Sequence, residues 1–156
     1  MFNRSLLDTN NDGIPEEIST VCGDIPQLTH RKEISSIVRT GANSFRVSYR
    51  VVVENLGGIS GNYTLTDRPI FDDDININSA SYTSDVIGIP GAALPGSGPW
   101  TLANLQNIGA GAVHTYNLVV NITIDLRPGS GGNNVYTRCG QTTQGVPSPG
   151  EGLFNR

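Results

Sequence analysis

The sequence predicts an all-β domain, built as a β-sandwich of about seven to eight mostly antiparallel strands. Two segments, at residues 44–58 and 114–125, alternate apolar and polar side chains with the two-residue period of a half-buried strand. The 19 Gly and 9 Pro of the 156-residue chain fall between short apolar runs, where they indicate turns. Helix signals are nearly absent.

The two alternating segments show which side chains are expected inside the sandwich. In the first segment this face carries Val47, Tyr49, Val51, Val53 and Asn55. In the second segment the equivalent face carries six residues, which are His114, Tyr116, Leu118, Val120, Ile122 and Ile124. Each segment is therefore expected to face the core on one side and solvent on the other.

The chain divides into an N-terminal strand and linker loop, residues 1–28, and the sandwich, residues 29–156, which is rich in loops after Leu126. The expected strands of the sandwich are residues 30–38, 45–54, 62–67, 75–82, 100–105, 113–124, 135–139 and 153–155. Residues 87–99 are expected to form a surface loop, because their many Gly and Pro residues disfavour a central strand.

Several function classes find no support in the composition. The net charge is −4 and the nine arginines are scattered, so no nucleic-acid footprint is present. No apolar stretch approaches the length of about 20 residues that a membrane span needs, and the N-terminus lacks signal-peptide regions, which suggests a piece of a larger protein. His30 and His114 are isolated and no nucleophile or phosphate-loop motif occurs, so we do not expect an enzyme.

An acidic segment near the N-terminus has the spacing of a calcium loop. Its oxygen ligands would come from Asp8, Asn10, Asp12, the carbonyl of Ile14, and Glu16. Calcium needs such an oxygen cluster, and the Asp-x-Asn-x-Asp-Gly spacing is similar to that of the Asp-rich calcium repeats of extracellular linkers. The segment is therefore expected to bind calcium, with a solvated acidic turn as the alternative.

Ser19 stands where an EF-hand would place a bidentate Glu, so an EF-hand is not expected. The run of residues 72–74, three aspartates, is a weaker candidate that we interpret as a charged loop. Cys22 and Cys139 are the only cysteines, and we expect this pair to form a disulfide, with two free buried thiols as the alternative.

A short phrase occurs at both ends of the chain: Phe-Asn-Arg at residues 2–4 recurs at residues 154–156. If the match is not chance, the chain is one period of a tandem array, and the strand that ends one module opens the next. Residues 2–7 would then be a spare strand, able to complete their own sandwich or a neighbour's.

Four motifs occur in the order SYRVVVENLGG, YTLTD, IGAGAVHTYNLVV and PGEGLFN, over about residues 29–156. This order resembles that of the Ig-like conserved-repeat domains found in tandem in large bacterial and archaeal cell-surface proteins. The long Gly- and Pro-rich segment departs from that pattern. The resemblance implies an Ig-like β-sandwich and an extracellular structural module of a stalk, adhesin or fibre, whose partners are neighbouring copies or adjacent repeats.

Domains of that kind, and the related collagen-adhesin domains, can join a strand lysine to an asparagine of the final strand by an isopeptide bond, assisted by a carboxyl group. The candidates here are Lys32, which is the only lysine, Asp67, and Asn155, or Asn3 if a neighbouring strand fills the last position. Strand parity allows Lys32 and Asp67 both to face the core, where burial favours the neutral amine and the protonated acid. The alternative is a solvent-facing lysine and a turn-capping aspartate.

The expected function is therefore a structural module that can assemble head-to-tail by strand complementation. The alternative is a carbohydrate- or protein-binding module that uses the loop around Trp100. A cluster of exposed aromatic side chains there would support this alternative, and a buried Trp100 would count against it.

Overall fold

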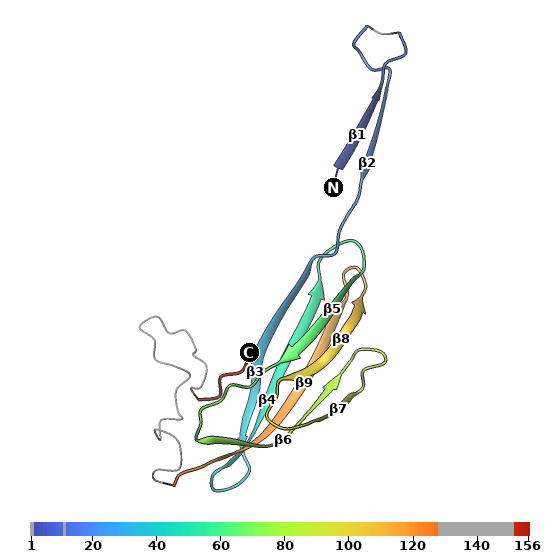
Figure 1. Cartoon of the computed structure of the whole chain (residues 1–156). Helices are drawn as coiled ribbons and strands as arrows, with labels where there is room; N and C mark the ends of the chain where they lie inside the picture. The colour runs from blue at the N-terminus through green and yellow to red at the C-terminus, as the bar shows by residue number, and fades with distance from the viewer. Residues whose placement is uncertain (1, 11, 128–151) are drawn as a thin grey trace, which may run out of the picture.

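The structure, a computed structural model, describes residues 2–10, 12–127 and 152–156. It is an all-β sandwich with a separate N-terminal hairpin, which confirms the predicted fold class (Figure 1). The strands are β1 (Phe2–Leu7), β2 (Glu17–Cys22), β3 (Leu28–Arg39), β4 (Ser44–Asn55), β5 (Gly61–Asp67), β6 (Ile75–Ser84), β7 (Gly91–Leu94), β8 (Trp100–Ile108) and β9 (Val113–Ile124).

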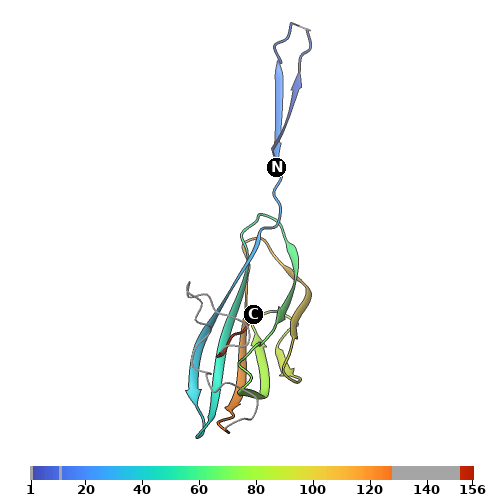
Figure 2. The same ribbon diagram turned by 60° about the vertical axis from the view of Figure 1, so that its left-hand side comes forward.

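Two antiparallel sheets form the sandwich. One sheet has five strands in the order β3-β4-β9-β6-β7, and the other pairs β5 with β8 (Figure 2). A bridge between Pro69 and Asn155 adds the C-terminal residues beside the continuation of β5. The chain thus begins the sandwich at one sheet edge, with β3, and its last residues lie next to the opposite sheet.

The inward faces of β4 and β9 form most of the core together with side chains of β8, and Ile75 and Ala80 of β6 and Val86 complete it. The predicted inward residues of β4, at positions 47, 49, 51, 53 and 55, are all buried. Of the six residues predicted on the inward face of β9, Tyr116, Leu118, Val120 and Ile122 are buried, whereas His114 and Ile124 near its ends are half-buried. β8 adds Trp100, Leu102 and Ile108 to the same core. The two-residue alternation therefore identified the buried face of both central strands.

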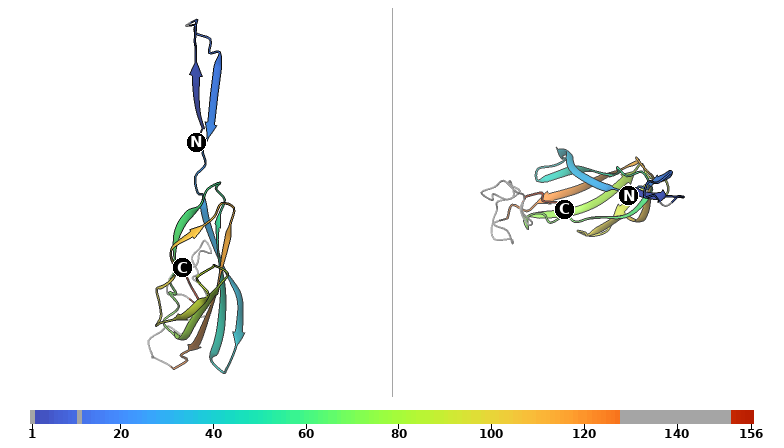
Figure 3. Two further views of the ribbon diagram at one scale, coloured as in Figure 1. Left: turned by 90° about the vertical axis from the view of Figure 1, so that its right-hand side faces the viewer. Right: turned by 90° about the horizontal axis from the view of Figure 1, so that it is seen from above.

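The N-terminal hairpin lies outside the sandwich. β1 pairs with β2 from Phe2 opposite Cys22 to Leu7 opposite Glu17, and the hairpin projects beyond one end of the sandwich (Figure 3). Residues 2–7 therefore form a strand as expected, but not one that completes their own sandwich. β2 was not predicted, because its Ile18 is half-exposed and its pattern marks no buried face.

The structure corrects one further expectation about strands and does not describe another. Residues 87–99 are not entirely loop, because β7 pairs along the edge of β6 from Leu94 opposite Ala80 to Gly91 opposite Thr83. An edge position tolerates Gly- and Pro-rich flanks that a central strand would not. The expected strand at residues 135–139 lies outside the described residues.

Asn55, at the end of β4, holds three loops together. Its side chain is fully buried. Its Nδ2 donates to the carbonyls of Ile59 at 2.7 Å and Gly109 at 3.1 Å. Its Oδ1 accepts from the backbone N–H of Gly57 at 3.0 Å and Gln27 at 3.1 Å. One amide thus satisfies backbone groups from three connections.

We expect Asn55→Ala to lower the free energy of unfolding by at least about 3 kcal/mol, because it leaves several buried backbone groups unpaired. Urea unfolding would measure the loss. Asn117→Ala, at an exposed position of β9, is the control and should change stability little. Equal stabilities of the two variants would contradict the role given to Asn55.

Candidate cross-linking site

Lys32 and Asp67 meet between the two sheets. Lys32 lies on β3 opposite Val51, and Asp67 is the last residue of β5. The Nζ of Lys32 donates to Oδ2 of Asp67. The Asp67 side chain is 3% exposed and that of Lys32 is 18% exposed, so the pair is largely shielded from water. The Lys32 Nζ also lies 5.1 Å from the ring centroid of Tyr49.

Asn155 reaches the same place from the C-terminal segment. This segment runs antiparallel to the residues that follow β5: Arg68 N–H donates to the Arg156 carbonyl at 2.7 Å, and Ile70 N–H donates to the Phe154 carbonyl at 2.9 Å. Lys32, Tyr49 and Asn155 line one cavity of about 210 Å³. The structure therefore brings together Lys32, Asp67 and Asn155, three of the cross-linking candidates from the sequence.

The polar atoms of this site are incompletely paired. Among the described residues, three buried side-chain atoms lack a hydrogen-bond partner, and these are Oδ1 of Asp67 and both Oδ1 and Nδ2 of Asn155. Each such atom costs about 1–3 kcal/mol when it is withdrawn from water without a partner. These unpaired atoms lie close to Lys32, the only lysine of the chain, and because buried polar atoms are rarely left unpaired they make these residues a candidate site.

Burial also affects the protonation of Lys32. Desolvation lowers the pKa of Lys32, although the charge of Asp67 and the hydrogen bond to it act in the opposite direction. A lowered pKa increases the fraction of neutral amine, which is the nucleophilic form.

The residue types of this site would suit an amide exchange. In that reaction the neutral Nζ of Lys32 would attack Cγ of Asn155, and Asp67 would take the proton from Nζ and pass it to the departing amide nitrogen. A new C–N bond would form, the old bond from Cγ to Nδ2 would break, and ammonia would leave. Asp67 would end in the protonation state in which it began, and no oxidant would be needed.

The tip of the hairpin brings together the carboxylates of three of the expected calcium ligands. The carboxylates of Asp8, Asp12 and Glu16 each offer an oxygen within 4.8 Å of the others. Asp8 Oδ2 accepts from Gly13 N–H at 2.8 Å, and Asp12 Oδ1 accepts from Ile14 N–H at 2.8 Å. A backbone hydrogen bond from Thr9 lowers the pKa of Glu16, which keeps this carboxylate charged.

Asn10 belongs to the same loop, since its Oδ1 accepts from Asp12 N–H at 3.0 Å. Ser19 lies in β2, away from the loop tip. Asp72, Asp73 and Asp74 also gather their carboxylates, with Asp72 and Asp74 buried. Burial raises the pKa of Asp72, which does not favour a charged ligand at that position.

Trp100 and His114, two further residues considered from the sequence, both take part in hydrogen bonds within the fold. Trp100 is 2% exposed and its Nε1 donates to the Pro95 carbonyl at 2.9 Å, which counts against a binding loop built around it. Tyr63 connects His114 and Tyr116, with its hydroxyl 2.7 Å from Nδ1 of the first and from the hydroxyl of the second. His114 is thus held by hydrogen bonding at the edge of the core.

Cys22 is exposed at the end of β2, and Cys139 lies outside the described residues. The Cys22–Cys139 disulfide therefore stays a prediction. The part of the chain that the structure describes contains no helix long and apolar enough to cross a membrane.

Comparison with known proteins adds no relative. No protein-family model, curated protein or solved structure matches the chain. Its function therefore has to be inferred from the residues and the fold.

Proposed function

We propose that this protein is a structural module of an extracellular stalk, adhesin or fibre, closed by an isopeptide bond between Lys32 and Asn155. The observation that carries the proposal is the meeting of Lys32, Asp67 and Asn155, with unpaired buried atoms on the last two. Such a bond would join the first strand of the sandwich to its last residues. A pull on the two ends would then load a covalent link instead of separating the sheets.

Mechanical unfolding tests this function. When the two ends of the protein are pulled, the bond would keep the segment between Lys32 and Asn155 from extending. This segment contains 155 − 32 = 123 peptide units. At roughly 3.3–3.6 Å per residue, this segment amounts to about 400 Å of hidden length. The Lys32→Arg protein, pulled in the same way, should release that length when it unfolds. Equal extension of the two proteins would contradict the proposal.

The hairpin loop adds a role for calcium in such a module. We propose that Ca²⁺ binds Asp8, Asn10, Asp12, the Ile14 carbonyl and Glu16, and stiffens the hairpin that leads to the next module. The cation would neutralise carboxylates that otherwise repel each other and would order the Gly-containing turn.

We expect Ca²⁺ to bind the protein with a measurable heat in calorimetry and to protect the hairpin from limited proteolysis. Asp12→Asn should weaken the binding at least about tenfold, since hard cations depend on ligand charge. Asp73→Asn, in the second acidic cluster, is the control and should leave the heat unchanged. Binding that is lost in Asp73→Asn but kept in Asp12→Asn would place the calcium elsewhere.

A further inference from the structure

Among the described residues, no strand pairs with one edge of β5. The other edge of β5 pairs with β8, and the continuation of β5 at residues 68–72 pairs with the C-terminal segment. In that pairing Arg156 lies opposite Arg68. Along Gly61–Asp67 no further strand pairs with this edge in the part of the chain that the structure describes. Unpaired strand edges are ready sites for an added strand.

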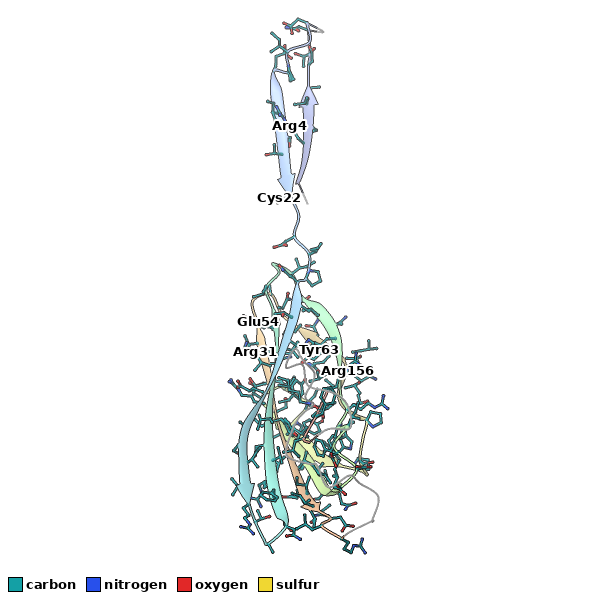
Figure 4. The ribbon with its side chains drawn as sticks, turned by 90° about the vertical axis from the view of Figure 1, so that its left-hand side faces the viewer. Arg4, Cys22, Arg31, Glu54, Tyr63 and Arg156 are labelled. Carbon is teal, nitrogen blue, oxygen red and sulfur yellow. The ribbon has the colours of Figure 1, made fainter. Side chains whose placement is uncertain are left out.

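A groove lies beside this edge. It has a volume of about 370 Å³ and is lined by residues 28–30 of β3, by Val53 of β4 and by residues 63–66 of β5. Figure 4 shows Tyr63 of β5 and the terminal Arg156 on the same side of the sandwich. A strand that continued past Arg156 in the same direction would enter the groove.

The chain itself contains a strand that fits this continuation. β1 begins with the Phe-Asn-Arg of residues 154–156 and continues with Ser5, Leu6 and Leu7. With Asn3 in the place of Asn155, opposite Pro69, the antiparallel register sets Ser5 opposite Asp67 and Leu7 opposite Leu65. Opposed residues share a face, so Leu7 would turn into the groove beside Leu65.

The N-terminal hairpin leaves β1 available for such docking. Leu6 and Leu7 are 56% and 54% exposed there. β1 pairs only with β2 among the described strands, so its second edge can pair with β5 while the hairpin stays intact. The hairpin projects from the sandwich, which suits a contact with another molecule (Figure 1).

We propose that, in a chain whose internal bond has not formed, β1 of a second copy docks along β5 in place of residues 154–156, and that Lys32 then forms its amide bond with Asn3 of that copy instead of Asn155. This inference rests on the cross-linking chemistry of the proposed function. The balance is the same: Nζ of Lys32 bonds to Cγ of Asn3, the bond from Cγ to the amide nitrogen breaks, and Asp67 passes the proton to the departing ammonia. Because the hairpin and the groove are different surfaces, repetition gives an open, head-to-tail fibre.

The test uses a labelled peptide with the sequence of residues 2–8 and the full-length Asn155→Ala protein, in which Lys32 has no internal partner. We expect a covalent adduct that survives boiling in detergent, with the summed mass less one ammonia. The same peptide with Ala in place of Asn3, and the Lys32→Arg protein with the original peptide, should give none. Without peptide, Asn155→Ala should form ladders that are lost in Asn3→Ala/Asn155→Ala.

The outcomes separate this inference from the proposed function. A native protein that has lost one ammonia, with no peptide adduct and no ladder, would overturn strand exchange and leave the internal bond in place. No ammonia loss in any sample would overturn both. If Asn155→Ala does not fold, the native chain refolded with excess peptide replaces it, and an adduct that competes with the internal bond is then expected.

Discussion

The native protein is expected to be lighter than its sequence by one ammonia, and Lys32→Arg to restore the full mass and lower stability. A bond between Lys32 and Asn155 closes a loop of more than a hundred residues, which in the chain-entropy model stabilises the fold by about 5 kcal/mol. Arginine keeps the charge that Asp67 contacts, but it stays protonated and cannot attack the amide. The loss of stability would therefore report the missing bond rather than an unpaired carboxylate.

Intact mass and chemical unfolding measure the two parts of this expectation. Asn155→Ala should also lose the mass deficit within the single chain, whereas Asn117→Ala, at an exposed position of β9, should retain it. If the native protein has its full sequence mass, and Lys32→Arg unfolds at the same urea concentration, then the lysine only forms an ion pair with Asp67.

The sequence allowed the inward faces of the central strands, and the inward direction of Lys32 and Asp67, to be predicted for one physical reason, whereas their candidacy for a cross-link came from the family resemblance. Period-two alternation assigned the inward residues of β4 and β9, and the same parity placed Lys32 and Asp67 inside. Both inferences need only the direction of a side chain from a strand, which sequence position determines.

Contacts between segments that are distant in the sequence could not be predicted from the alternation of side chains along a strand. Asn55 was assigned to the correct face, but four of the five hydrogen bonds of its side chain join it to loops that the strand pattern does not describe. The Asn-x-Gly spacing to Gly57 is the one local signal of this role, because the Asn55 side chain accepts from that backbone N–H. β2 lacked a signal for a different reason: it pairs with β1 without burying a face against the sandwich.

Asp67→Asn is expected to leave the sandwich folded but to slow formation of the bond by about 10²–10⁴-fold, the usual contribution of a positioned acid–base group. The amide has nearly the same shape as the carboxyl group, so the packing around residue 67 is kept. It cannot accept the proton from Nζ of Lys32 or return it to the departing nitrogen, and without that transfer the release of ammonia is slow.

Refolding from denaturant, followed by mass at successive times, would measure the rate of bond formation in Asp67→Asn. Asp72→Asn is the matched control, because Asp72 is as deeply buried as Asp67 but does not contact Lys32 in the structure. It should close the bond at the native rate. Closure of Asp67→Asn at that rate would mean that the amine loses its proton to water, and that Asp67 only positions Lys32 beside Asn155.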